Sequence, residues 1–297
     1  MFHVEPMKKT PPLKVIDHLV TKQEFLISHN DLTEVLETTP RPSKQEIHKY
    51  YESNNYTSHK SDKKTFINIL YKIIRKLSIK RKYNILRGFL KTTKINLLDV
   101  GCGNGDFLMY CERRGCNAVG IENNKNALIS SRNEKHLTVY NDFEQMHKSS
   151  EIILNNKKFD AITMWHSLEH LHDLDLVISN LQKVLCDKGV ILVACPNHLS
   201  YDAQHYSKYW AAYDVPRHLW HFNRHSIQKV FAKHEIELVK VFPMRWDAFY
   251  ISMLSEKIKL GQSNIIKAIY VGLISNLKAR FTKEHSSLLY VFQKTSK

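Results

Sequence analysis

Short apolar runs alternate with helix-like stretches through the middle and end of the chain. The runs lie at residues 95–100, 116–122, 136–142, 159–165, 190–197, 236–242 and 286–294, and amphipathic stretches such as 106–114, 125–134 and 174–185 separate several of them. Strands that alternate with helices form βαβ units, because parallel neighbours need a crossover connection. Apolar runs without polar alternation fit strands that are buried on both faces. The pattern predicts a doubly wound α/β sheet that begins near Asn96, with the last run as a candidate antiparallel edge strand.

The residues before the predicted sheet follow a different pattern. Five of the eight prolines precede residue 43, so we expect residues 1–45 to form a loop-rich leader with short helices. Residues 43–87 contain neither proline nor glycine, and Phe66, Leu70, Ile74 and Leu77 recur at three- and four-residue steps, which predicts an amphipathic helix. We therefore expect an N-terminal helical extension over residues 1–94 and a sheet domain over 95–297. The mixed stretch 244–285 is expected to be a helical insertion before the last strand.

The composition narrows the class of protein. The chain has 297 residues, of which 43% are hydrophobic and 25% charged. A chain of this length buries roughly 75% of its unfolded surface and needs no disulfide or metal to hold its core. Its five cysteines form no C-x-x-C pair, and their odd number argues against a disulfide framework. We also expect no signal peptide and no membrane span, because the apolar stretch 264–281 is interrupted by Lys267 and Lys278. These features together predict a cytoplasmic protein.

Positive charge is in excess along the chain. There are 44 Lys and Arg residues against 29 Asp and Glu, which gives a net charge of +15. Residues 71–94 carry nine of these cations and no acid. This segment is either a solvated helix face or a surface for an anionic partner such as RNA.

Three of the nine glycines lie within five residues, at the turn that follows the first predicted strand. Ligands bind at the carboxyl ends of the strands in this type of sheet. The dinucleotide motif G-x-G-x-x-G fails here, because Asp106 stands where its third glycine would be, and no P-loop motif is present. An aspartate in the first helical turn opposes a bound phosphate. The loop therefore favours a nucleoside ligand that lacks phosphates and carries positive charge.

Acidic residues end the next two predicted strands. Glu122 follows the second strand at the position where an acid accepts hydrogen bonds from ribose hydroxyls. Asp142 and Phe143 follow the third strand, where a carboxylate can accept from an adenine amine and an aromatic ring can pack on the base. Asp142 could equally be an ordinary helix cap.

Four segments in this order resemble the class I S-adenosylmethionine-dependent methyltransferases: LLDVGCGNGDF at 97–107, the strand end at Glu122, NDF at 141–143 and FDAITMWHSLEHLHD at 159–173. The resemblance covers roughly residues 95–243, and over the whole chain it is to bacterial methyltransferase-domain proteins similar to the ubiquinone-biosynthesis O-methyltransferases. It implies a Rossmann-like seven-stranded sheet of order 3-2-1-4-5-7-6, with the last strand antiparallel. It also implies S-adenosylmethionine as cofactor, S-adenosylhomocysteine as product, and 244–285 as a cap on the substrate side. The implied cofactor site comprises Asp99, Gly101, Cys102, Gly103, Gly105, Glu122, Asn123, Asp142, Phe143 and His166, with Tyr56 on an N-terminal lid.

Histidines crowd the rim beyond the fourth and fifth strands. The first group is His166, Glu169, His170 and His172, and the second is His198, His205, His218, His221 and His225. One interpretation is a divalent metal site: His166, Glu169 and His170 share a face if their segment is helical, with His218 or His221 as a further candidate. Related methyltransferases carry E-x-x-E-H here, and the histidine at position 166 argues against magnesium.

The interpretation we favour needs no metal. His166 or His170, with His221 as the next candidate, takes a proton from an attacking hydroxyl, and Glu169 belongs to the same catalytic group. A third interpretation is that several of these histidines only pack or cap.

The sequence therefore predicts a methyltransferase that acts on an oxygen of a small molecule, such as a quinone, lipid or glycan precursor. The oxygen preference rests on the resemblance and on the histidine rim. Two alternatives stay open: an RNA methyltransferase that uses the basic segment 71–94, and a non-catalytic module that binds S-adenosylmethionine. Residues 264–281 could also contact an anionic membrane surface. The sequence makes no prediction of the oligomeric state.

Overall fold

The computed structural model describes residues 11–31, 33, 35–51, 66–92, 94–149 and 158–295. The chain divides into two compact units. The seven-stranded unit comprises Lys60–Cys195, Val230–Phe242 and Leu289–Lys297, and the four-stranded unit comprises Met1–His59, Pro196–Lys229 and Pro243–Leu288. The chain thus leaves and re-enters each unit, and we describe each unit by itself.

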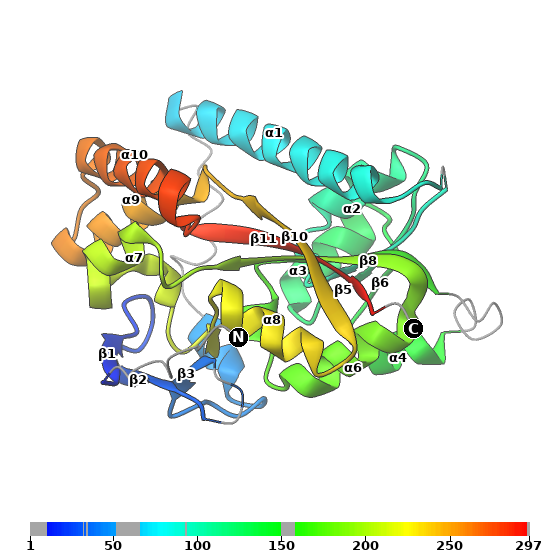
Figure 1. Ribbon diagram of the computed structural model, residues 1–297, viewed down its shortest axis with the longest axis horizontal. Coiled ribbons are helices and arrows are strands. Elements are labelled where there is room, and N and C mark those ends of the chain that lie inside the picture. Colours follow the sequence, from blue (N-terminus) through cyan, green and yellow to red (C-terminus); the bar gives the residue numbers. More distant parts are fainter. Residues whose placement is uncertain are drawn as a thin grey trace, which may run out of the picture. The chain divides into compact units, whose positions relative to one another are not determined.

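The larger sheet has the strand order predicted from the sequence. Its strands are β4 (Asn96–Val100), β5 (Asn117–Ile121), β6 (Val139–Tyr140), β7 (Phe159–Trp165), β8 (Leu185–Pro196), β10 (Ile236–Pro243) and β11 (Ser287–Lys294). Their order is β10-β11-β8-β7-β4-β5-β6, and β4 through β8 pair in parallel. Figure 1 shows β11 running opposite to β8. Counted within this sheet, the order is 3-2-1-4-5-7-6 read from β6, so the expected class of fold is confirmed.

The central strands are apolar because helices cover both faces of the sheet. Leu98 of β4 lies in register between Val119 of β5 and Ile162 of β7, and all three are buried. Figure 1 shows α1 (Phe66–Phe89) and α2 (Asp106–Glu112) on one side and α4 (Phe143–Lys148) and α6 (Leu174–Val184) on the other. The short helix α3 (Lys125–Ile129) continues into a π-helical turn, η2 (Ser130–Glu134). The predicted helix at 66–77 is confirmed as part of α1.

Three strands stand where short N-terminal helices were expected, so that expectation was wrong for the described residues. β1 (Leu13–Ile16), β2 (Glu24–His29) and β3 (Leu36–Thr39) form an antiparallel sheet with β9 (Trp220–His221). The prolines at 11, 12, 40 and 42 lie just outside the strands, where they remove no ladder hydrogen bond. Each strand is too short to show a clear alternation, and its single buried face is completed by residues far along the chain.

A buried ion pair joins the end of β1 to the segment before β9. Arg217 donates to Asp17 at 3.0 Å and to Asp214 at 2.7 Å, and its guanidinium also donates to the carbonyl of Tyr50. Burial acts to raise the pKa of Asp17, but the Thr21 amide and the Arg217 charge outweigh it and hold the pKa below its ordinary value. Removing one partner of such a pair would leave a buried charge uncompensated. The pair therefore stabilises the contact between two segments of this unit that are far apart in the sequence.

The predicted insertion at 244–285 is helical and belongs to the four-stranded unit. It contains α9 (Asp247–Leu260) and α10 (Ile265–Thr282), and α7 (Tyr201–Tyr206) and α8 (Arg224–Ala232) precede it. Short 3-10 turns lie at η1 (Ile47–Tyr51), η3 (Leu168–His170), η4 (Ser207–Tyr209) and η5 (Ala211–Tyr213). Buried Asp202 of α7 accepts hydrogen bonds from Trp210, Ser275 and Ser286 at 2.6–2.8 Å. Among the described helices, none has the length and apolarity to cross a membrane.

Candidate functional site

Two glycines of the turn after β4 have positive φ angles but different surroundings. Gly101 has φ +74°, and a Cβ at this position would collide with the side chain of Ser167. Gly103 has φ +54°, and a Cβ there would meet no atom within 4 Å. The turn at Gly101 is therefore required by close packing within the protein, whereas the backbone at Gly103 faces open space that a ligand can approach. Gly105 follows as the N-cap of α2.

Glu122 connects the end of β5 to this turn. Its carboxylate accepts a hydrogen bond from the Gly103 amide and another from the Asn124 amide, both at 2.8 Å. The side chain is nearly buried, whereas neighbouring Asn123 is exposed. Each carboxylate oxygen can accept more than one hydrogen bond, so Glu122 can hold the turn and still accept from a ligand hydroxyl.

Asp99 lies in β4, just before the turn, and faces β7, the neighbouring strand in the sheet. Its carboxylate is buried and accepts a hydrogen bond from Thr163 Oγ1 of β7 at 2.6 Å. Burial raises the pKa of Asp99 to about 7, although the hydrogen bond from Thr163 opposes that shift. The contact with Thr163 joins β4 to β7 just before the turn.

Cys102 occupies a packing position within the turn. Its sulfur lies against Gly120 of β5, where a Cβ would collide with it. Burial raises the pKa of the thiol, so Cys102 stays protonated and has the character of a small apolar side chain.

Asp142 adopts the helix-cap role that the sequence left open. It is the N-cap of α4, and its Oδ1 accepts a hydrogen bond from the Gln145 amide at 2.7 Å. The side chain is exposed, so its carboxylate also remains accessible to a ligand. The ring of the half-buried Phe143 stacks with His147, with ring centroids 6.5 Å apart.

The charge of Asp106 is compensated by two cations that sequence reasoning did not assign to it. Asp106 forms ion pairs with Arg75 of α1 and with Lys135. Lys135 follows η2, and its ammonium group also donates to the carbonyl of Asn104 at 2.6 Å. These residues are far apart in the sequence, so no local motif signals the cluster.

His166 directly follows β7 and has a left-handed backbone conformation with φ +55°. Such a conformation is uncommon for a residue with a side chain and is often found at functional sites. The His166 amide donates to the carbonyl of Ala194 at 3.0 Å, and Ser167 Oγ donates to the carbonyl of Val100 at 2.7 Å. These bonds attach the segment after β7 to β8 and to the end of β4.

His166 and Glu169 come together as the sequence suggested, but on a tighter turn. Residues 168–170 form the short 3-10 turn η3, so His166 and Glu169 do not share an α-helical face. His166 Nδ1 lies 3.5 Å from Glu169 Oε1, and the Glu169 carboxylate is buried. Cys195 donates its thiol to Glu169 Oε2 at 3.6 Å. Glu169 thus places a buried carboxylate beside the imidazole of His166.

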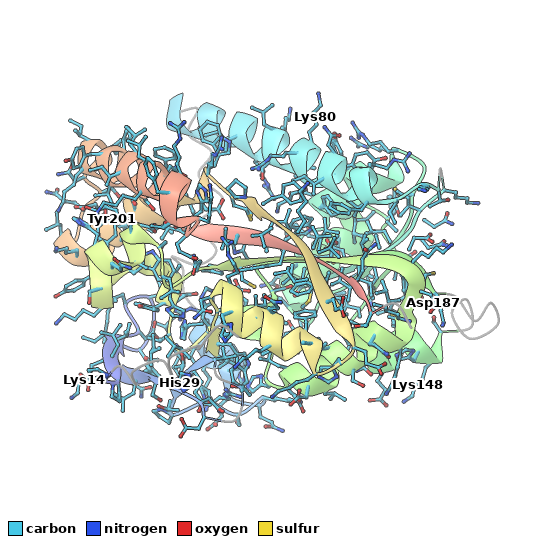
Figure 2. All side chains as sticks on the ribbon, in the orientation of Figure 1. Lys14, His29, Lys80, Lys148, Asp187 and Tyr201 are labelled. Atoms are coloured by element: carbon cyan, nitrogen blue, oxygen red, sulfur yellow. The ribbon has the colours of Figure 1, made fainter. Side chains whose placement is uncertain are left out.

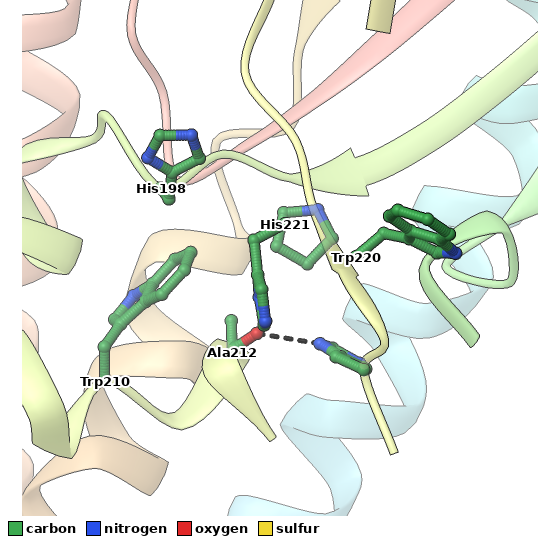
Figure 3. Close-up of a pocket in the computed structure, with 7 residues that line it drawn as sticks. His198, Trp210, Ala212, Trp220 and His221 are labelled. Atoms are coloured by element: carbon green, nitrogen blue, oxygen red, sulfur yellow. Dashed lines mark hydrogen bonds between the residues drawn. The ribbon is translucent and has the colours of Figure 1, made fainter. Parts of the chain in front are cut away.

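The second group of histidines belongs to the four-stranded unit. His198, His218 and His221 line a pocket with Trp210 and Trp220 (Figure 3). The close-up shows the hydrogen bond between His218 Nδ1 and the carbonyl of Ala212, which is 2.8 Å long.

For two of these histidines, the hydrogen-bond partner determines whether Nε2 donates or accepts. Thr38 Oγ1 donates to the carbonyl of His218, so His221 Nε2 must donate to Thr38 Oγ1, at 2.9 Å. Asn223 donates to His198 Nε2 at 3.2 Å, and burial lowers the pKa of His198 to about 4. His198 is therefore neutral near pH 7, and the buried His221 is engaged in packing within its own unit.

Tyr56, which the resemblance placed on a lid, lies outside the described residues. The described part of that segment includes Tyr50, whose hydroxyl donates to Gln23 at 3.1 Å within the four-stranded unit. The lid role of Tyr56 stays a prediction.

Comparison with known proteins finds a family model, curated relatives and similar solved structures. A family model described as "Methyltransferase domain" matches residues 71–241. The ubiquinone biosynthesis O-methyltransferases of Pelagibacter ubique and Rhizobium etli are 33% and 29% identical over 104 residues, or 35% of this chain. These matches span 42% of the length of each relative. Among solved structures, the geranyl diphosphate C-methyltransferase of Streptomyces coelicolor has a TM-score of 0.48 at 14% identity, over 73% of this chain and 76% of that one.

The raised pKa of Asp99 predicts a pH-dependent stability. The folded protein keeps the Asp99 proton up to about pH 7, whereas the unfolded chain releases it near the ordinary value of 3.8. Since the native state binds more protons between these values, this group lowers the free energy of unfolding as pH rises toward 7, by at most about 1.4 kcal/mol per pH unit. Urea denaturation at pH 5 and at pH 7.5 measures this change. Between the two pH values, the free energy of unfolding should fall less in Asp99→Asn than in the wild type. Asp187→Asn, which removes an exposed carboxylate, is the control, and equal pH dependence in all three proteins would contradict the prediction.

Proposed function

Because the chain belongs to the methyltransferase-domain family, we propose that it is an enzyme that transfers a methyl group from S-adenosylmethionine to an oxygen of a small molecule. The observation that carries the proposal is the open backbone at Gly103, held by the buried carboxylate of Glu122. The ubiquinone biosynthesis O-methyltransferases among its relatives support oxygen as the acceptor atom.

The residues around the turn fit a nucleoside that carries no phosphates. Glu122 is placed to accept hydrogen bonds from ribose hydroxyls, as in other nucleoside sites at the end of a second strand. Asp142 offers an exposed carboxylate to an adenine amine, and Phe143 offers a ring surface. When bound, the sulfonium cofactor supplies a methyl group that is already activated for transfer. The protein then has to bring donor and acceptor together in line, which can contribute about 7–11 kcal/mol.

We assign the proton transfer to His166, positioned by Glu169. An acceptor hydroxyl must lose its proton as it attacks, and a histidine titrates in the range where it can take that proton. Glu169 beside Nδ1 would stabilise the imidazolium that forms, with Nε2 as the atom that receives the proton. His170, the neighbouring candidate, lies at the end of the same 3-10 turn. In this proposal no metal is required, and residues 244–285 take part in selecting the acceptor.

The structure of the basic helix α1 supports an RNA substrate less than the sequence alone did. Arg75 is ion-paired with Asp106, and the Lys82 ammonium lies 4.3 Å from the centre of the Trp165 ring. Lys80 points away from the helix into solvent (Figure 2). Part of the charge is thus used within the seven-stranded unit, which favours a small acceptor. We also place the enzyme in the cytoplasm, because all five cysteines are free thiols.

The donor site can be tested with two matched glycines. Gly103 and Gly115 both have positive φ and open space around their Cβ positions, but Gly115 lies in the turn between α2 and β5. Each Val substitution should cost a similar strain of about 1–2 kcal/mol. We expect Gly103→Val to weaken S-adenosylmethionine binding by roughly tenfold or more in calorimetry and Gly115→Val to leave it unchanged. Equal affinities in both variants would contradict the site.

The acceptor class can be identified by transfer of label. The protein is incubated with methyl-labelled donor and an extract of its source organism, and label is counted in the organic, small aqueous, RNA and protein fractions. We expect label in the organic or small-molecule fraction. Label confined to RNA and lost after nuclease treatment would replace the small acceptor by RNA. No transfer despite donor binding would support the non-catalytic module.

The assigned base can be tested with a matched histidine. His136 has the same φ of +55° as His166 and is exposed in the same unit. We expect His166→Ala to lower the transfer rate by roughly 10²–10⁴-fold and His136→Ala to leave it unchanged. Donor affinity measured in both variants separates loss of binding from loss of transfer. An unchanged rate in His166→Ala would exclude it as the base, and loss of activity with EDTA would favour the metal interpretation.

A further inference from the structure

Helix α10 packs into the four-stranded unit through its smallest side chains. Ala268, Val271, Gly272, Ser275 and Ala279 are the buried residues of this helix. A Cβ at Gly272 would collide with the ring of Phe249 on α9, so the two helices approach closely there. Figure 1 shows α9 and α10 side by side. The inner face of α10 therefore buries little apolar surface for its length.

The large apolar side chains of α10 face the opposite way. Ile266 is 84% exposed and Phe281 is 88% exposed. Four more exposed residues, Ile269, Tyr270, Leu273 and Leu277, lie between them. At 100° per residue these positions form one stripe centred almost opposite the buried face. The stripe runs from Ile266 to Phe281, so it extends over about 23 Å of the helix. A continuous exposed apolar surface of this kind usually marks an interaction site.

The charges around this stripe are positive. Lys257 and Lys259 on α9 and Lys278, Arg280 and Lys283 at the end of α10 are exposed. Between residues 248 and 283 the chain contains one acid, Glu256, which is fully buried and paired with Lys267 at 3.2 Å. The surface of this helical pair therefore presents an apolar stripe with exposed cations near it, and Asp247 at the first turn of α9 is half-buried.

We propose that the α10 stripe binds the surface of an anionic lipid bilayer. Apolar side chains enter the boundary between headgroups and acyl chains, while the bordering cations contact anionic headgroups. Lys278 and Arg280 lie within the helix and are exposed, which keeps the helix at the surface. A second copy of this face is a poorer partner, because a symmetric contact would bring like charges together. The inference does not depend on the proposed methyl transfer.

Vesicle sedimentation with the full-length protein tests the proposal. We expect binding to vesicles of equal parts phosphatidylglycerol and phosphatidylcholine, and roughly tenfold or more weaker binding to pure phosphatidylcholine. The double variant Ile266→Glu/Leu273→Glu should lose binding to the anionic vesicles. Lys259→Gln/Arg280→Gln should weaken it by roughly tenfold or more, since each cation near an anionic surface contributes about fivefold. Circular dichroism and thermal melts should show that these exposed changes leave the fold intact.

Leu176→Glu on α6 is the matched control, because Leu176 is 53% exposed in the seven-stranded unit. It should bind the anionic vesicles as the wild type does. The proposal is overturned if the wild type does not sediment with anionic vesicles or if Ile266→Glu/Leu273→Glu binds them undiminished. It is also overturned if the wild type does not bind lipid and light scattering shows that it is a dimer, whereas Ile266→Glu/Leu273→Glu is a monomer. Donor binding in every variant shows separately whether the proposed function stands.

Discussion

The contact between Gly101 and Ser167 is the constraint on which the candidate site depends. Ser167 occupies the space that a side chain at residue 101 would need, and its hydroxyl donates to the carbonyl of Val100. The turn after β4 and the segment after β7 can therefore lie against each other only with glycine at 101. The same contact places His166, which precedes Ser167, on the side of the sheet where the glycine turn opens. One close approach thus brings together the backbone proposed to receive the donor and the side chain proposed to receive the proton.

Acidic side chains lie at this turn and beside it. Glu122 accepts hydrogen bonds from the amides of Gly103 and Asn124, whereas Asp99 is buried in β4 and keeps its proton to about pH 7. Asp106 is balanced by Arg75 and Lys135. The site therefore concentrates acidic side chains without leaving them uncompensated. Because two cations balance Asp106, its charge no longer argues against a phosphate as it did in the loop sequence. The expectation of a nucleoside ligand therefore depends on Glu122 and Asp142.

The parts predicted correctly depend on local patterns. Buried parallel strands are apolar throughout, and the family resemblance supplied their order, which the structure confirms. Glycines at a strand end and an acid after the next strand are also local signals. The N-terminal strands were missed because β1 to β3 are short and complete their core with residues from 203–271, so no local periodicity announces them. Likewise, the spacing of the histidines could not show that His221 would be buried against Thr38.

The sequence by itself determined the class of sheet, the glycine turn and the acids beside it, because strand burial and turn geometry leave their mark on neighbouring residues. It also indicated a helical insertion over residues 244–285. Only the tertiary structure decided which side is covered. Close packing of α9 against Gly272 buries the small residues and leaves Ile266 and Phe281 exposed. Helical periodicity defines faces relative to one another, but the face that is buried depends on the shape of the partner.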